Sequence, residues 1–442
     1  MSRRLLTVIR KGVLKNTLTF VALVLSGGSI YNLSYLRGSF ERVMLDALHL
    51  NDTELGQISA LLGLASLICY FPGGWLADRF SSRLLLSLSC VLTGLGGFYM
   101  MSLTGAEGST YTEMMGLHVF WSITSILTYW AALIKATQDW GAEKQGVAFG
   151  LLDSGRGLVQ VLLTTLSIWV FSQYSDQGEG LSGVMAVHTV ACLLSGLACW
   201  VYIPESSGSE RTGSTPDLKG EETSTLDDLL QLIRLPAVWL MGAIVFTAYG
   251  SYWSTFTFAR YAEEVYGLET ESAAYLSTVA MWVRSLMPLI AGVIADRLGR
   301  VRVVSVSFML CVACFCAFAF TAGGASLSWL LFANVVILSF GIFALRGVYF
   351  ALMKGTNIPA RLSGLAVGVV SLIGFTPDII VPLFKGALVE AYTNPSTGVV
   401  DMAYHQVFFA TLAVTALLGA VATIALGRLS GEGEERALSG AS

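Results

Sequence analysis

The stretch Gly73-Gly74-Trp75-Leu76-Ala77-Asp78-Arg79-Phe80-Ser81-Ser82-Arg83 is a short charged island between two long apolar runs. A second copy, Ala291-Gly292-Val293-Ile294-Ala295-Asp296-Arg297-Leu298-Gly299-Arg300, lies in the other half of the chain. Both copies contain glycine, then small or apolar residues, then Asp-Arg, and then a further arginine. A turn repeated in this way predicts a chain built from two matched halves.

The composition indicates a protein whose solvent is the lipid bilayer. The chain has 442 residues, of which 54% are hydrophobic and 13% are charged, whereas soluble domains carry about 25% charged residues. The net charge of −4 points to no particular partner, and no basic patch suggests nucleic acid. The seven cysteines lie mostly in apolar runs, so we expect helix packing rather than a disulfide framework or a metal site.

Apolar runs long enough to cross a membrane recur along the whole chain. A crossing helix takes about 20 residues, and lipid requires every backbone amide to be satisfied within its own segment. We expect a six-helix bundle over 1–203, a linker over 204–236, a second bundle over 237–428 and a disordered tail over 429–442. The twelve expected spans are 16–40, 53–77, 84–103, 115–138, 146–172, 183–203, 237–259, 273–295, 303–321, 328–352, 363–388 and 405–427.

Two features of the loops predict the linker and the orientation. Residues 224–233 are predicted as a capped amphipathic helix at the membrane surface, closed by Pro236. The lysines and arginines of short loops gather on one side of a twelve-span arrangement, so we expect both termini in the cytoplasm. These basic residues are those of the N-terminal segment with Arg79, Arg83, Lys144, Arg297, Arg300, Arg302, Lys354 and Arg361.

The repeated Asp-Arg turns resemble the loop between the second and third helices of major facilitator superfamily transporters, and its counterpart between the eighth and ninth. The resemblance covers nearly the whole chain. It implies an all-α membrane protein whose twelve transmembrane helices form two six-helix bundles, the major facilitator fold. It also implies that the turns latch the two halves in the outward-facing state. The gating residues would be Gly74, Asp78, Arg79, Arg83, Asp296 and Arg297. The alternative is that the arginines only enforce topology, although topology alone would not require the acid.

Ionisable residues inside the expected spans mark candidate sites, because they are costly in lipid and usually functional. The cations are Arg37, Lys135, Arg156, Arg284 and Arg346, and the acids are Asp153 and Asp378. This surplus of positive charge favours an anionic substrate, since guanidinium offers paired donors to carboxylate, phosphate or sulfonate. For Arg37 and Lys135 the alternative is snorkelling to the headgroups.

The two acids are candidates for proton coupling. Asp153 and Arg156 are three residues apart, so they share a helix face and can form a pair that breaks when substrate arrives. Asp378 lies between Pro377 and Pro382 in a broken helix, where it could bind a proton or pair with Arg346. Aromatic residues are dense around these charges, although most aromatics in such a protein pack or form the interface belt. The substrate-binding candidates are Arg37, Arg156, Arg284, Arg346, Tyr35, Trp130, Tyr249, Trp253 and Tyr349.

The first half also resembles the organophosphate:phosphate antiporter branch, which includes the glycerol-3-phosphate transporters. Residues 31–37, Tyr-Asn-Leu-Ser-Tyr-Leu-Arg, resemble its first helix, with Arg37 at the place of a substrate-binding arginine. Residues 146–157 resemble its fifth helix, with Arg156 at the place of a substrate-site histidine. The branch has a second phosphate-binding arginine where this chain has Ala248, and a lysine where this chain has Tyr70. The phosphate clamp is therefore not reproduced, which puts a phosphate ester substrate in doubt.

These observations predict a secondary active transporter that moves a small organic anion across the cell inner membrane by alternating access, as proton symport or as antiport. The alternative is a proton-driven exporter of drugs or siderophores on the same fold, but cationic drug export would need a surplus of acids. We expect a monomer whose partners are the anion, a proton or counter-anion, and lipid.

No nucleotide loop or nucleophile triad is present, and none of His49, His118, His188 and His405 pairs at ligand spacing. No enzyme, cofactor or metal site is therefore expected.

Overall fold

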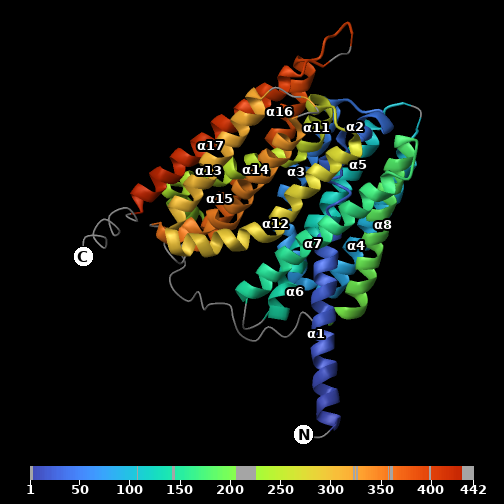
Figure 1. Ribbon diagram of the computed structural model, residues 1–442. Coiled ribbons are helices and arrows are strands. Elements are labelled where there is room, and N and C mark those ends of the chain that lie inside the picture. Colours follow the sequence, from blue (N-terminus) through green and yellow to red (C-terminus); the bar gives the residue numbers. More distant parts are fainter. Residues whose placement is uncertain are drawn as a thin grey trace. The chain divides into compact units, whose positions relative to one another are not determined.

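The computed structural model consists of helices joined by turns and loops over the residues that it describes, which are 3–106, 108–141, 145–205, 225–321, 324, 327–356, 358, 362–397 and 400–430. Figure 1 shows the order of the helices along the chain. The first half contains α1 (Arg3–Ser29), α2 (Arg37–Ala47), α3 (Asp52–Arg79), α4 (Ser82–Leu103), α5 (Tyr111–Ser122), the π-helix η1 (Ile123–Leu127), α6 (Trp130–Gly141), α7 (Gln145–Phe171) and α8 (Gln177–Tyr202). The remainder contains α9 (Thr225–Ile233), α10 (Pro236–Trp253), the 3₁₀-helix η2 (Ser254–Phe256), α11 (Phe258–Tyr266), α12 (Thr270–Leu298), α13 (Arg300–Phe320), α14 (Ser328–Val348), the 3₁₀-helix η4 (Tyr349–Gly355), α15 (Ser363–Gly374), α16 (Pro377–Ala391) and α17 (Ala403–Leu429).

Membrane-length helices account for most of the predicted spans. In the part of the chain that the structure describes, ten helical segments are long and apolar enough to cross a membrane by length and composition. The other two predicted spans coincide with the apolar end of α1, Asn16–Ser29, and with α10. The hydropathy pattern thus located the helices correctly, because lipid rewards continuous apolar helical surface.

Several of these segments are interrupted, and the interruptions lie beside candidate site residues. A turn over 30–36 separates α1 from α2, η1 follows α5, η2 follows α10, and η4 follows α14. Residues 375–376 separate α15 from α16. Pro377 accounts for this last break, because it has no N–H to donate to the Ile373 carbonyl and its ring crowds that carbonyl in a continuous helix. The predicted break in the eleventh span is therefore confirmed.

Two sequence-based boundaries are wrong in detail. The span predicted as one helix over 16–40 stops at Ser29, and Asn32 donates its side-chain amide to the Gly28 carbonyl 3.1 Å away. Such side-chain bonds compete with the helical ladder. Pro236 was predicted to close the amphipathic helix, but it is the first residue of α10, where its missing N–H costs nothing. The amphipathic helix itself is present as α9.

Some sequence-based expectations fall on residues that the structure does not describe. These are the linker over 206–224, the loop residues Lys144 and Arg361, and the tail from 431.

The chain divides into two compact units. The first comprises Met1–Arg211 with Glu269–Ser285, and the second comprises Thr212–Leu268 with Leu286–Ser442. The first part of α12 therefore groups with the N-terminal helices. Small residues permit close helix packing within each unit. A Cβ at Gly196 of α8 would lie 3.0 Å from the Ser87 carbonyl oxygen of α4, and one at Gly419 of α17 would meet Phe308 of α13 at 2.5 Å.

Candidate functional site

The first unit carries a polar stripe along one face of α7. Asp153, Arg156 and Gln160 stand at helical spacings of three and four residues, so they share that face. Arg156 Nη1 lies 3.9 Å from Asp153 Oδ1, which is the pair expected from the sequence. The Arg156 side chain is 12% exposed, whereas that of Asp153 is 54% exposed. Water or a ligand can therefore reach the acid more readily than the guanidinium.

The guanidinium of Arg156 is held by α1 and flanked by aromatic rings. Its Nε donates to the Gly27 carbonyl oxygen over 3.1 Å. Its Cζ lies 5.4 Å from the Trp130 ring centroid and 5.8 Å from that of Tyr31, within range of cation–π attraction. A Cβ at Gly28 would lie 2.5 Å from Val159 Cβ, so glycine is what lets α1 approach α7 this closely.

A second guanidinium joins the same stripe. Arg284, in the part of α12 that belongs to the first unit, donates from Nη1 to Gln160 Oε1 over 3.1 Å. Gln160 lies one helical turn beyond Arg156. The stripe from Asp153 to Gln160, together with Arg284, therefore combines two guanidinium groups with a single half-exposed carboxylate. We call this set the α7 basic stripe.

Arg37 lies apart from this stripe in its interactions. It is the first residue of α2, and its Nη2 lies 3.5 Å from Glu41 Oε1, with both side chains buried. Its Nη1 donates to Ser59 Oγ over 2.6 Å. The bond to Ser59 joins α2 to α3, and the Glu41 carboxylate, within α2, offsets the positive charge of Arg37.

Lys135 and Tyr35 also make structural contacts in the first unit. Lys135 Nζ donates to the Ala77 carbonyl oxygen over 2.7 Å, which satisfies a carbonyl near the end of α3. Tyr35 lies in the turn after α1 and packs partly buried against a hydrophobic core cluster.

The second unit holds an aspartate bound by two aromatic donors. Tyr249 Oη donates to Asp378 Oδ2 over 3.2 Å, and Trp253 Nε1 donates to Asp378 Oδ1 over 2.9 Å. The donors lie on α10, while Asp378 lies in the first turn of α16, directly after the break. Both carboxylate oxygens are thus hydrogen-bonded, and the helix N-terminus adds favourable partial charge. Three candidates from the sequence are brought together here.

Arg346 of α14 joins this group through Tyr249. Its Cζ lies 4.1 Å from the Tyr252 ring centroid and 5.5 Å from that of Tyr249. Tyr249 therefore touches both the carboxylate and the guanidinium. Tyr349 is buried and packs its ring against that of Phe350, with centroids 4.8 Å apart.

The two Asp-Arg turns differ in their contacts. In the first copy, Arg79 stacks on Trp75 at 3.9 Å and Arg83 stacks on Trp200 at 4.4 Å. In the second copy, Arg300 Nη2 lies 4.0 Å from Asp296 Oδ1. The side chain of Asp78 and the surroundings of Gly74 are outside what the structure describes, and Arg297 is exposed. The latch role of these residues stays a prediction.

Gly73 in the first turn approaches the backbone of η1. A Cβ there would lie 2.9 Å from the Leu127 carbonyl oxygen, so glycine is what permits this close approach. The added Cβ at Gly292 in the second turn would meet nothing within 4 Å. The repeated motif therefore packs tightly in only one of its two copies.

Sequence reasoning missed a buried charged group in the second unit. Arg260 Nε donates to Glu264 Oε1 over 2.8 Å, and Tyr404 and His405 of α17 contact the other oxygen. The spacing of Arg260 and Glu264, four residues apart, was the available signal for a helical pair.

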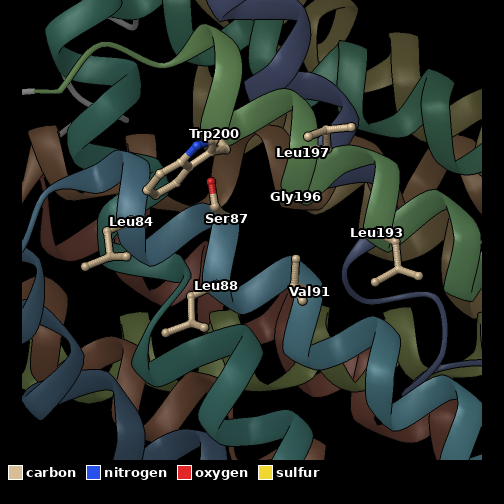
Figure 2. A pocket seen from close by; sticks show the side chains of 8 residues that line it. All are labelled: Leu84, Ser87, Leu88, Val91, Leu193, Gly196, Leu197 and Trp200. Atoms are coloured by element: carbon tan, nitrogen blue, oxygen red, sulfur yellow. The ribbon is translucent and has the colours of Figure 1, made fainter.

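A surface groove lies between α4 and α8, and Figure 2 shows its lining side chains. Its volume is about 320 Å³, and it is lined by Leu84, Ser87, Leu88, Val91, Leu193, Gly196, Leu197 and Trp200. No charged side chain is among these lining residues, so the groove lacks the donors that an anion requires. None of these lining residues belongs to the α7 basic stripe.

Comparison with known proteins identifies the family. The model of the Major Facilitator Superfamily matches residues 19–382. The chain belongs to the major facilitator superfamily. Superfamily membership makes it a multi-pass membrane transporter rather than an enzyme, with the all-α fold predicted from the repeated turns.

Relatives within the superfamily include inner membrane proteins. Inner membrane protein YqcE of Escherichia coli is 27% identical over 85% of this chain and 89% of its own length. Inner membrane protein YihN of the same organism is 24% identical over 92% of this chain and 94% of its own length. The probable nitrate/nitrite antiporter NarK1 of Thermus thermophilus is 23% identical over 59% of this chain and 56% of its own length.

Solved structures share the superfamily fold. A bacterial homologue of the human lysosomal transporter Spinster aligns with a TM-score of 0.72 and 15% identity, covering 95% of this chain and 98% of its own. The nucleoside transporter NupG aligns with a TM-score of 0.69 and 16% identity, covering 93% and 98%. At these identities the likeness carries the fold and not the substrate.

Proposed function

We propose that this protein is a secondary active transporter that moves a small organic anion across the inner membrane by alternating access. The family supports the transport class. The anionic substrate is supported by the surplus of guanidinium in the α7 basic stripe. A relative named as a nitrate/nitrite antiporter is consistent with an anion-handling branch of the superfamily.

The observation that carries the proposal is that two guanidinium groups lie on one face of α7. Arg156 extends from that face, and Arg284 of α12 bonds to Gln160 on it. Each guanidinium already makes one hydrogen bond to a neutral acceptor, at Gly27 and Gln160 respectively. Their positions are therefore determined by uncharged partners, and their remaining N–H groups can bind a bidentate anion. Asp153 is the acid paired with the stripe, and its 3.9 Å separation from Arg156 is that of a loose ion pair. An arriving anion competes with it.

We assign coupling to an acid in the spans, with a proton or a counter-anion as the second transported species. Asp378 is the better proton site, because protonating it requires only that one of its two aromatic donors change partner. Asp153 acts instead as the group that the anion displaces. The substrate-binding candidates of the second unit are Arg346, Tyr249, Trp253 and Tyr349. In the first unit, Trp130 is the aromatic candidate.

Other features of the proposal follow from the sequence. Both termini are cytoplasmic, the protein works as a monomer, and Asp78 with its neighbouring arginines latches the outward-facing state. A phosphate ester is disfavoured as substrate within the resemblance to the glycerol-3-phosphate branch, because Ala248 and Tyr70 replace that branch's basic residues. Carboxylates, sulfonates and inorganic anions are favoured.

The test is a thermal-shift screen of the purified protein against carboxylates, sulfonates, phosphate esters, nitrate and lipophilic cations. Anions should raise the melting temperature, and Arg156→Gln and Arg284→Gln should each remove that rise. Arg302→Gln changes the net charge equally at an exposed position of α13 and should leave the rise intact. Stabilisation by cations but not by anions would favour the drug exporter and overturn the proposal.

A further inference from the structure

The buried charged group around Glu264 in the second unit takes no part in the proposed function. It joins α11, α16 and α17 through Arg260, Glu264, Lys385, Tyr404 and His405. The side chains of Arg260 and Glu264 are 4% and 7% exposed, and that of His405 is 1% exposed. Lys385 and Tyr404 are also buried. Burying this many ionisable groups is costly in a membrane protein, and such groups usually serve a function.

Glu264 is the centre of the group. Arg260 Nε donates to its Oε1 over 2.8 Å, while Tyr404 Oη donates to its Oε2 over 2.6 Å. His405 Nε2 lies 2.8 Å from the same Oε2. Burial by itself raises the pKa of Glu264, but the His405 hydrogen bond, the Arg260 charge and the Tyr404 hydroxyl together lower it to about 2. The carboxylate is therefore ionised, and α11 is tied to α17 by two of its three donors.

The protonation state of His405 follows from this geometry. An ionised carboxylate can only accept, so the hydrogen must be on His405 Nε2. His405 Nδ1 is buried and makes no hydrogen bond to any side chain or backbone atom that the structure describes. A proton added to Nδ1 would create a buried donor without an acceptor, which is unfavourable. The imidazole is neutral while the group is intact.

Apart from Glu264, every charged neighbour of His405 opposes a further proton on its ring. Arg260 on α11 and Lys385 on α16 are buried cations whose charges reach His405, and both oppose a further positive charge. Tyr404 and Tyr261 contact its ring and are uncharged. Helix α10 carries no charged side chain, and the charges of α13 lie at its opposite end, at Arg300 and Arg302. Only Glu264 favours a proton, and it is already neutralised by Arg260.

We propose that His405 is a proton-binding site that fills only when α17 separates from α11, so that proton binding and opening of this helix pair are coupled. Separation breaks the bonds from Tyr404 and His405 to Glu264 and admits water to the imidazole. The released side chain then has the ordinary histidine pKa of about 6.5. Because the joined state excludes the proton and the separated state accepts it, falling pH through about 6.5 favours separation.

Any role of this proton binding in transport rests on the proposed function, but the experiment that tests the proton binding itself does not. The protein, labelled with ¹⁵N in histidine, is reconstituted without any anion, and its imidazole resonances are followed from about pH 8 to about pH 5 across the ordinary histidine range. Hydrogen–deuterium exchange of α11, corrected for the intrinsic pH dependence, is measured on the same samples. The resonances of the other three histidines, exposed His49 and buried His118 and His188, are recorded on the same samples.

The His405 resonance should titrate between about pH 5 and 6.5, together with a rise in α11 exchange. His405→Gln keeps a donor toward Glu264 without a titrating group, so the acid-induced rise in exchange should disappear. Glu264→Gln weakens the joined state and should move the midpoint upward, while neighbouring Glu263→Gln should not.

A His405 resonance that stays neutral to the end of the titration would overturn the proposal. So would an exchange rise that persists in His405→Gln. Neither result bears on whether the α7 basic stripe binds anions, and a failed anion screen would leave both measurements interpretable.

Discussion

Replacing Gly27 by alanine should displace Arg156 without touching its charge. A Cβ at Gly27 would lie 2.7 Å from Arg156 Cδ and 2.8 Å from both Cγ and Nε. The arginine must move away, and its Nε then loses the 3.1 Å bond to the Gly27 carbonyl oxygen. A hydrogen bond from a charged donor contributes about 1.5–3 kcal/mol. We expect the free energy of unfolding to fall by about that amount.

The same displacement should weaken anion binding. Bidentate recognition depends on the direction of the guanidinium, and a loss of about 1.4 kcal/mol is tenfold in affinity. We therefore expect Gly27→Ala to bind the anion found in the screen at least about tenfold more weakly. Isothermal titration calorimetry gives the affinity, and thermal unfolding of the ligand-free protein gives the stability.

Gly116→Ala is the matched control for this substitution. Gly116 lies within α5, and its added Cβ would meet nothing within 4 Å. Alanine there should leave binding unchanged and stabilise the helix by about 0.5–1 kcal/mol. If Gly27→Ala lowers stability but binds the anion with unchanged affinity, the placement of Arg156 is structural and its assignment to the substrate is refuted.

Four further outcomes are expected. Gly73→Ala forces its Cβ to within 2.9 Å of a carbonyl oxygen of η1 and should cost about 1–3 kcal/mol. Gly292→Ala adds its Cβ in open space within α12 and should instead raise stability by about 0.5–1 kcal/mol, as thermal unfolding of both variants will measure. Asp378→Asn replaces one of two acceptor oxygens with a donor, so it should lower stability by about 1–3 kcal/mol. It should also abolish pH-dependent transport of the anion, and an unchanged proton flux would exclude Asp378 from coupling. While α11 stays joined to α17, the pKa of Glu264, about 2, lies below its ordinary value. The contribution of Glu264 to stability in that state, on the order of 3 kcal/mol, is present above about pH 4.3 and is lost as the pH falls toward 2, or earlier where the two helices separate; acid unfolding of Glu264→Gln should lack this component. Asp78→Asn should shift the inward–outward equilibrium, measured by spin-label distances, with normal insertion, and an unaltered transport rate would contradict the latch.

Local patterns accounted for much of the fold and part of the site. Continuous apolar runs located the spans, and Pro377 located the break before Asp378, since both effects act within a few residues. The pairing of Asp153 with Arg156 also followed from helical periodicity. Each of these inferences needs only the geometry of a single helix.

The partners of the other charges could not be derived in the same way. Arg37 was assigned to substrate, yet its guanidinium is paired with Glu41 and bonded to Ser59 across to α3. Lys385 was not recognised among the membrane charges at all, although it is buried near His405. These contacts depend on how each helix is rotated toward its neighbours. In a membrane protein, lipid-facing and helix-facing surfaces are both apolar, so hydropathy does not encode that rotation.

The sequence by itself determined a helical membrane protein of two matched halves with surplus arginine in its spans, because length, hydropathy and charge are properties of the chain read in order. Only the tertiary structure decided that Arg284 of α12 bonds to the face of α7 that carries Arg156, and that Glu264 joins Arg260 to His405. Such groupings arise from close helix approach at particular small residues, such as Gly27 and Gly28. The packing of several helices together selects those approaches, and no single segment contains that information.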